Sequence, residues 1–255
     1  MWGFYILKQH TMKTLVLGDT HGRPYWKEIV AKENPDRVVF IGDYFDSYDD
    51  YTAAEQMDNF KKIVEYKQSG KAEVVMLVGN HDYHYMRGVS EHYSGYQGGA
   101  APAIQQLLED NKEHLQMCYQ LGDFLFSHAG ISHDWLTIHG YSVEHDVVEW
   151  VNDKFKFTPK VFEFSGWEPH GDSPTSSPIW IRPLSLLRSN ADTHLQEHFV
   201  QVVGHTQVSE IKLTGNESIG KYYLIDALDT SGQYMVIDIT LDEDKITFPV
   251  YKKEE

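Results

Sequence analysis

Five short segments of the chain place a carboxylate, an amide or an imidazole beside glycine. Glycine at such a point lets the backbone turn sharply and leaves space beside the polar side chain. Together the segments supply the oxygen and nitrogen donors that metals of intermediate hardness bind, such as Mn, Fe, Zn or Ni. One such segment is typical of a simple turn, whereas five in succession favour a site for two divalent or trivalent metals. The segments are Gly18-Asp19-Thr20-His21-Gly22, Gly42-Asp43-Tyr44-Phe45-Asp46, Gly79-Asn80-His81-Asp82, Ser127-His128-Ala129-Gly130 and Val203-Gly204-His205-Thr206.

Each segment follows a short apolar run that is typical of a buried strand. The first three runs cover Lys13–Leu17, Arg37–Ile41 and Glu73–Val78, and predicted helices at residues 24–33 and Thr52–Gln68 separate them. This order predicts βαβ units and a parallel sheet with helices on its faces. Because α/β proteins place their sites at the carboxyl ends of such strands, the polar segments should meet at one edge.

The rest of the chain has a looser pattern. Residues 84–101 are rich in Gly, Tyr and His and predict a loop, while residues 156–179 predict an irregular insertion. No linker divides the chain, so we expect one domain over residues 12–255, with residues 1–11 as an N-terminal extension. The other predicted elements are a helix at Ala101–Asn111, a hairpin of Leu115–Leu121 with Phe124–His128, two helical pieces in residues 133–155, and strands at Phe199–Gly204, Ser209–Leu213, Tyr222–Ala227, Gln233–Thr240 and Lys245–Tyr251.

The composition excludes several classes of protein. The chain has 255 residues and a net charge of −16, which argues against a nucleic-acid polymer as partner. Its one cysteine, Cys118, excludes a disulfide framework and a thiolate zinc cluster and favours a reducing, cytoplasmic location. No apolar run approaches the roughly 20 residues of a membrane span, so no membrane association is expected. The sequence carries no signature of an oligomeric state.

The ordered motifs GDxHG, GDxxD, GNHD, HAG and GHT resemble those of the calcineurin-like metallophosphoesterase superfamily. Within it, the chain is similar to the branch of the Ser/Thr protein phosphatases and the bacterial diadenosine tetraphosphate hydrolases. The motifs run from Asp19 to Thr206, over most of the chain. The resemblance implies a four-layer α/β sandwich of two mixed β-sheets flanked by helices, with the active site in loops at strand carboxyl ends. The β-rich C-terminal third is expected to form the second sheet.

The resemblance also implies a role for each motif residue. The metal ligands would be Asp19, His21, Asp43, Asn80, His128 and His205. The first two would hold one metal, the last three would hold the other, and Asp43 would bridge both, with Mn expected in vitro. His81 would act as the general acid, oriented by Asp46. A hydroxide bridging the two metals would attack the phosphorus in line with the leaving oxygen.

One position departs from the family pattern. The related phosphatases and hydrolases usually carry an arginine after the last aspartate of the second motif, whereas here Ser47 follows Asp46. Serine has no charge, so the phosphate clamp expected at this point is missing. Arg182 and Arg23 are the candidate replacements. With Asn80, they form the predicted substrate-binding set.

The motifs predict an enzyme that hydrolyses a phosphomonoester, carried by a phosphorylated small molecule or a phosphoprotein. The alternative enzyme is a nucleotidase or dinucleoside polyphosphate hydrolase, and the alternative of another class is a non-catalytic protein-binding scaffold. Aromatic side chains near the motifs could stack a base or simply pack the fold. They are Tyr44, Phe45, Tyr48, Tyr51, Tyr83, Tyr85, Tyr93 and Tyr96. Histidines without motif context are expected at the surface or at caps; they are His84, His92, His133, His139, His145, His170, His194 and His198.

Overall fold

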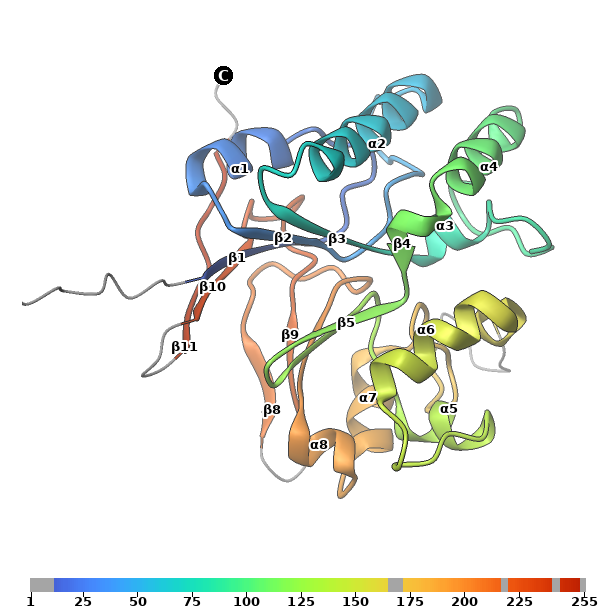
Figure 1. The fold of residues 1–255 in the computed structure, drawn as a ribbon, viewed down its shortest axis with the longest axis vertical. Helices are drawn as coiled ribbons and strands as arrows, with labels where there is room; N and C mark the ends of the chain where they lie inside the picture. Colours follow the sequence, from blue (N-terminus) through green and yellow to red (C-terminus); the bar gives the residue numbers. More distant parts are fainter. Residues whose placement is uncertain (1–11, 165–171, 217–219, 240–243, 253–255) are drawn as a thin grey trace, which may run out of the picture.

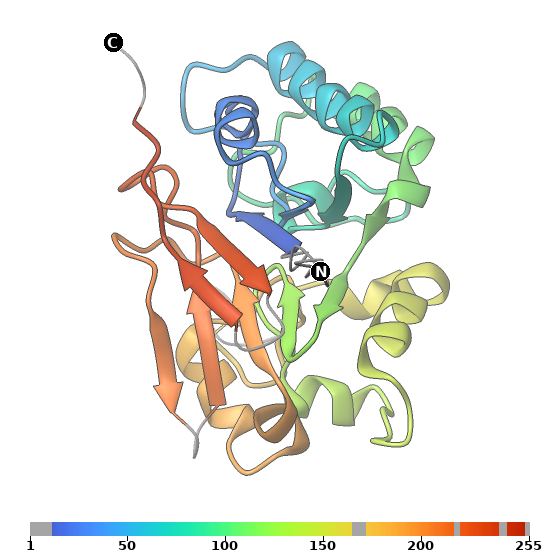
Figure 2. The ribbon, with the colours of Figure 1, turned by 60° about the vertical axis from the view of Figure 1, so that its left-hand side comes forward.

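The computed structural model describes residues 12–164, 172–216, 220–239 and 244–252. In this part of the chain, two β-sheets pack face to face and helices cover their outer sides (Figures 1 and 2). The predicted four-layer α/β arrangement is therefore confirmed. The N-terminal extension, residues 165–171 of the insertion, and His170 with them lie outside the described residues.

One sheet has six described strands in the order β11-β10-β1-β2-β3-β4. The pairs β1–β2, β2–β3 and β3–β4 are parallel, as the strand–helix–strand pattern predicts. On the other side of β1, β10 pairs antiparallel with β1, and β11 pairs antiparallel with β10. The strands are β1 Met12–Leu17, β2 Arg37–Phe40, β3 Glu73–Leu77, β4 Leu115–Gln116, β10 Met235–Ile239 and β11 Asp244–Thr247.

The second sheet has five described strands in the order β5-β6-β7-β9-β8. Its centre is parallel, because β7 pairs in that sense with both β6 and β9, and the two edge strands run antiparallel. The strands are β5 Cys118–Leu121, β6 Phe124–Ser127, β7 Val200–Val203, β8 Leu213–Asn216 and β9 Gly220–Leu224.

Helices α1, α2 and α4 lie over the six-stranded sheet, whereas α5 to α8 gather beside the other sheet (Figure 1). The start of α2 is set by a capping box, in which Thr52 accepts from the Glu55 amide and the Glu55 carboxylate accepts from the Thr52 amide. No helix in the described ranges is long and apolar enough to cross a membrane. The helices are α1 Trp26–Glu33, α2 Ala53–Gln68, α3 Asn80–Tyr83, α4 Ala101–Asp110, α5 His133–Ile138, α6 Val147–Phe157, α7 Pro183–Asn190 and α8 His194–His198, with 3-10 turns η1 Lys112–His114 and η2 Pro159–Phe162.

The alternation of side chains along the central strands builds two cores. In β1, Leu15 and Leu17 join the apolar cluster that contains Ile29 of α1 and Ile63 of α2. Val16 points to the opposite face and joins the cluster between the two sheets. Both faces of the six-stranded sheet are therefore buried along β1.

Three sequence expectations differ from the structure. The stretch Leu115–Leu121 was expected as one strand, but it divides into β4 and β5, which belong to different sheets. The C-terminal third contributes to both sheets, because β10 covers the otherwise unpaired edge of β1 and β11 pairs with β10. The strand expected at Ser209–Leu213 begins only at Leu213, where pairing with β9 starts.

Candidate active site

The five glycine-flanked segments all lie at the carboxyl ends of strands. Asp19 and Asp43 follow β1 and β2, and Asn80 opens α3 directly after β3. His128 and His205 follow β6 and β7 of the second sheet. The structure brings these five side chains, together with His21, to one edge of the sandwich, as the sequence predicts.

Two glycines allow the strand ends to approach each other. A Cβ atom added to Gly79 would lie 2.1 Å from Asp43 Oδ1, and one added to Gly204 would lie 2.2 Å from Asp19 Oδ1. No real side chain tolerates such a contact, so any substitution would displace a carboxylate. The glycines of the motifs are therefore needed for close packing of the acidic groups.

The backbone of the site is held in an unusual conformation. Of the six non-glycine residues with positive φ in the described part of the chain, four carry motif side chains. These φ angles are 44° at His21, 54° at Asp43, 59° at Asp46 and 59° at His205. Left-handed backbone at such residues costs about 1–3 kcal/mol each and persists where surrounding structure enforces it. The fold therefore gives up some stability in order to orient these four side chains.

The first group of potential metal ligands comprises Asp19, His21 and Asp43. One donor atom from each lies within 4.8 Å of the others. His21 Nε2 is 3.8 Å from Asp43 Oδ2, while His21 Nδ1 lies 2.8 Å from the Phe45 carbonyl oxygen. That carbonyl can only accept, so Nδ1 carries the proton and Nε2 presents its lone pair to the carboxylates.

The second group comprises Asn80, His128 and His205. The Asn80 Oδ1 atom lies 3.0 Å from His128 Nε2 and 2.9 Å from His205 Nδ1. His128 Nε2 is also 3.4 Å from Asp43 Oδ2. Asp43 therefore stands between the two groups, which is the position that a bridging carboxylate requires.

The electrostatics of the site fit a pair of cations. Burial, with the neighbouring charge of Asp226, raises the pKa of Asp19 well above its usual value, and burial with Asp19 does the same to Asp43. Burial lowers the pKa of His21 to about 4 and that of His128 to about 3, so both imidazoles are neutral at pH 7. Burial also lowers the pKa of His205 well below its usual value, so this imidazole is neutral too. Crowded carboxylates and neutral imidazoles are the donor set that a bound metal would complete.

The predicted pair of His81 and Asp46 lies beside this cluster. His81 Nδ1 is 2.9 Å from Asp46 Oδ2, and the His81 amide donates to Asp43 Oδ1 at 2.9 Å. Burial by itself raises the pKa of Asp46, but bonds from His81, His84 and Tyr85 outweigh it and hold the pKa below its usual value. Asp46 is therefore an ionised partner for His81.

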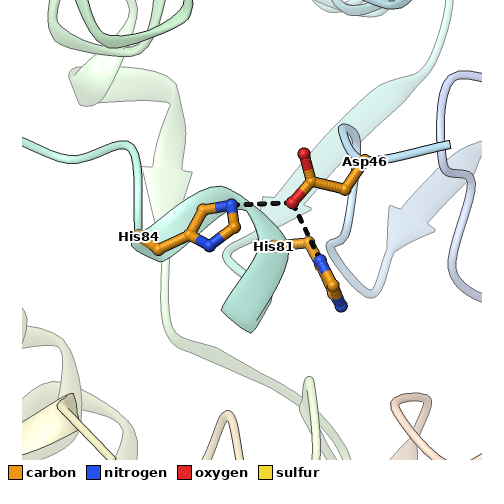
Figure 3. A group of neighbouring side chains, drawn as sticks. All are labelled: Asp46, His81 and His84. Atoms are coloured by element: carbon orange, nitrogen blue, oxygen red, sulfur yellow. Dashed lines mark hydrogen bonds and ion pairs between the residues drawn. The ribbon is translucent and has the colours of Figure 1, made fainter. Parts of the chain in front are cut away.

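Sequence reasoning assigned His84 to the surface or a cap, and the surface assignment is wrong. The His84 side chain is fully buried, and its Nε2 lies 2.7 Å from the same Asp46 oxygen that His81 contacts (Figure 3). Tyr85 Oη also donates to Asp46 at 2.5 Å, and Gln97 Nε2 donates at 3.2 Å. The sequence feature that could have indicated this contact is the three-residue spacing between His81 and His84, which places both imidazoles on one side of a helical turn.

Asp82 is a second residue without a predicted role. It is fully buried, and its carboxylate accepts from the amides of Gly79, Asp43 and Tyr44 at 2.7 to 2.9 Å. These bonds tie the turn after β2 to the turn after β3. In the sequence, this role could have been predicted from the acidic residue at the third position of the short helix α3, where carboxylates commonly accept from backbone amides.

A cavity of about 980 Å³ opens over the site. His81, Arg23 and Arg182 lie in its wall. Arg182 Nη1 donates at 3.1 Å both to the His205 carbonyl and to Thr206 Oγ1. Arg23 is paired with two aspartates, at 2.7 Å to Asp49 and 3.0 Å to Asp229.

Most of the aromatic residues near the motifs pack in the interior of the protein. Tyr44, Phe45, Tyr83 and Tyr85 belong to the buried core. Of the eight residues singled out in the sequence, Tyr48 and Tyr93 line the cavity. Phe164, from the insertion at residues 156–179, and Trp180 complete the aromatic part of its described wall.

Comparison with known proteins agrees with this geometry. The family model for calcineurin-like phosphoesterases matches residues 12–209. Among curated proteins, no significant match is found.

Solved structures share the fold at low sequence identity. A cold-active protein tyrosine phosphatase is 18% identical, with a TM-score of 0.59 over 92% of this chain and 78% of its own. A point mutant of a cold-active protein tyrosine phosphatase is 17% identical, with a TM-score of 0.62 over 92% and 80%. A Saccharomyces cerevisiae serine/threonine phosphatase described as similar to human PP5 is 15% identical, with a TM-score of 0.53 over 96% and 81%. With the family match over most of its length, the chain belongs to the calcineurin-like phosphoesterase family and is a metal-dependent phosphoesterase.

Proposed function

We propose that the protein is a phosphomonoesterase that uses two metal ions and acts on a phosphorylated small molecule or a phosphoprotein. One observation carries the proposal. Six potential ligands converge beneath an open cavity, and the His81–Asp46 pair stands in the same wall. A non-catalytic scaffold would have no need to keep the general acid beside a complete ligand set.

The proposed ligands are the six residues that the motifs predict. Asp19 and His21 would hold one ion, and Asn80, His128 and His205 would hold the other, with Asp43 between them. When bound, two such ions activate a water molecule and neutralise phosphoryl oxygens. Mixed carboxylate, amide and imidazole donors suit Mn, Fe, Zn or Ni, and we propose Mn for activity in vitro.

The chain itself supplies proton transfer and orientation. An ionised Asp46 orients the ring of His81 through Nδ1, so that the other ring nitrogen can give a proton to the leaving oxygen. Arg182 is the proposed phosphate ligand, because it lies in the cavity wall and is anchored to the backbone of His205. Arg23 contributes less in this proposal, since two aspartates already neutralise it.

Two substrate classes are supported by different observations. The similar solved structures are described as protein tyrosine and serine/threonine phosphatases, which favours a phosphoprotein. The aromatic wall formed by Tyr48, Tyr93 and Trp180 favours a second candidate, a nucleotide or dinucleoside polyphosphate whose base could stack there.

We also propose that residues 12–255 form one domain and that the protein works in a reducing compartment, the cytoplasm. The continuous apolar cluster supports the first statement, because it joins residues of β1, β6 and α6. The single buried thiol of Cys118 supports the second.

The test is hydrolysis of p-nitrophenyl phosphate by metal-stripped protein to which Mn is returned. We expect turnover with this monoester and much less with bis-p-nitrophenyl phosphate. His81→Ala should lower kcat by about 100-fold or more, the usual contribution of a general acid. Asp43→Asn should abolish activity by weakening both metal positions.

His145→Ala is the matched control, because His145 is an exposed histidine outside the cavity lining. Near-normal rates for His81→Ala would remove it from the mechanism. Bound metal without turnover on any phosphoester would favour the scaffold. Panels of phosphopeptides, nucleotides and dinucleoside polyphosphates then separate the two substrate classes by kcat/KM.

A further inference from the structure

His84 lies one helical turn beyond His81. It caps the short helix α3, and its amide donates to the Asn80 carbonyl oxygen. This spacing directs both imidazoles to the same side, where His84 Nε2 and His81 Nδ1 approach Asp46 Oδ2 at 2.7 and 2.9 Å (Figure 3). One carboxylate oxygen therefore lies between two imidazoles.

The other ring nitrogen of His84 determines where its proton resides. The Tyr93 amide donates to His84 Nδ1 at 3.2 Å, so Nδ1 must be unprotonated. Burial lowers the pKa of His84, which agrees with a neutral ring. A neutral imidazole without a proton on Nδ1 carries it on Nε2, and Nε2 faces Asp46.

The same argument excludes a third metal ion at this group. Donor atoms of Asp46, His81 and His84 are close enough to suggest one. A neutral histidine that binds metal through Nε2 needs its proton on Nδ1. In this structure an N–H group faces His84 Nδ1, so a metal on Nε2 would require an imidazolate. The 2.7 Å distance from His84 Nε2 to Asp46 Oδ2 instead favours a direct electrostatic contact between the N–H group and the carboxylate.

Four polar groups contact the Asp46 carboxylate, two at each oxygen. Oδ2 faces His81 and His84, and Oδ1 accepts from Tyr85 and Gln97. His81 is the only one of the four that lines the cavity. The other three hold the carboxylate in place from behind.

We propose that His84 is a positioning residue for the general acid: its neutral ring, with the Nε2–H group 2.7 Å from Asp46 Oδ2, holds that oxygen beside His81 Nδ1. The aspartate is thereby kept in one orientation, and in Figure 3 the second ring nitrogen of His81 points away from it. The proposal deepens the proposed phosphoesterase function and rests on the role given to His81 there.

The contact also couples the pair to the cavity wall. Tyr93, whose amide sets the tautomer of His84, stacks on the His84 ring with centroids 5.2 Å apart. Tyr93 also meets Trp180 edge-on at 4.4 Å, and both line the cavity. Tyr93 therefore both lines the cavity and determines which ring nitrogen of His84 carries the proton.

The test compares substrates that need a general acid with one that does not. Phenyl phosphate has a poor leaving group that needs a proton, whereas 2,4-dinitrophenyl phosphate does not. His84→Phe keeps a ring against Tyr93 but removes the donor. We expect kcat for phenyl phosphate to fall by about 10-fold or more, the worth of one hydrogen bond to a charged group, and kcat for the dinitrophenyl ester to change little. In a His81→Ala background, His84→Phe should add no further loss.

His84→Gln restores an N–H donor and should return kcat for phenyl phosphate to within about threefold of wild type. Tyr96→Phe is the matched control, because the Tyr96 ring packs on His84 at 5.0 Å and the substitution keeps that ring. Long-range ¹H–¹⁵N spectra of the zinc-loaded wild type test the tautomer directly, whether or not His84→Phe folds.

A proton on Nδ1, an equal loss with both esters, or a loss that multiplies with His81→Ala would each overturn the proposal. A wild-type protein that hydrolyses no phosphoester, yet shows the Nε2–H tautomer, would instead contradict the proposed function and leave the geometry of His84 standing.

Discussion

At the scale of single residues, the two candidate arginines differ in how they are anchored. Both line the cavity; Arg23 is held between Asp49 and Asp229, and Arg182 donates to the His205 carbonyl and the Thr206 hydroxyl. A guanidinium already balanced by two carboxylates attracts a phosphate less strongly. Arg23 is therefore the weaker candidate, and Arg182, anchored beside the His205 ligand, is the stronger one.

Arg182→Ala should raise KM for phosphomonoesters by about 10- to 100-fold, the worth of a charged hydrogen bond to phosphate. Arg23→Ala should change KM much less and lower the thermal midpoint, because it leaves two aspartates uncompensated. Steady-state kinetics on p-nitrophenyl phosphate measure the first effect, and calorimetry measures the second. Arg188→Ala, at an exposed position of α7, is the control. An unchanged KM in Arg182→Ala would remove that residue from the substrate site.

Sequence reasoning predicted the side chains at strand ends and missed those behind them. Asp19, Asp43 and Asn80 each follow an apolar run, a pattern visible over a few residues. Asp82 and His84 act through contacts with Asp43, Asp46 and Tyr93, which come from other turns of the chain. Such roles depend on how loops meet in space, and no local spacing encodes that meeting.

At the scale of elements, the path from β4 to β5 explains why one predicted strand became two. The side chain of Asn152, from α6, accepts from the amides of Met117 and Cys118 at 2.8 and 3.2 Å and donates to the Cys118 carbonyl at 3.0 Å. Without the Asn152 side chain, these amides would be free to continue the hydrogen bonding of a single β-strand. Asn152 satisfies them at the point where the chain passes from one sheet to the other, a contact across about 35 residues that a strand pattern does not reveal.

Asn152→Ala should therefore lower the free energy of unfolding by about 2–3 kcal/mol, because three buried backbone groups lose their partner together. Asn152 is not among the residues that line the cavity, so kcat should stay within about twofold of wild type if the fold persists. Urea denaturation measures the stability. Asn111→Ala removes one bond, to the Leu107 carbonyl, and should cost clearly less. Equal costs for the two variants would contradict the bridging role of Asn152.

At the scale of the whole molecule, where the net charge is −16, the buried acidic and histidine side chains of the site make stability and metal binding depend on pH. The buried Asp19 and Asp43 have raised pKa values, so ionising them in the metal-free fold costs stability as pH rises above the ordinary carboxyl range. His21 and His128 have lowered pKa values, so their contribution is present above pH 6.5 and is lost as pH falls towards 4. Metal binding needs all four groups unprotonated, and it should strengthen with pH.

Returning Mn to the metal-stripped protein should therefore stabilise the whole fold. At a free metal concentration of about 100 times the dissociation constant, one bound ion contributes about 2.7 kcal/mol. For a chain of this size that corresponds to a rise in Tm of about 5–10 °C, and the rise should be larger at pH 8 than at pH 6. Differential scanning calorimetry with EDTA reversal measures it, and Asp43→Asn should lose most of the rise because Asp43 lies between both ligand groups. An equal rise in wild type and Asp43→Asn would mean that the stabilising ions bind elsewhere on the acidic surface.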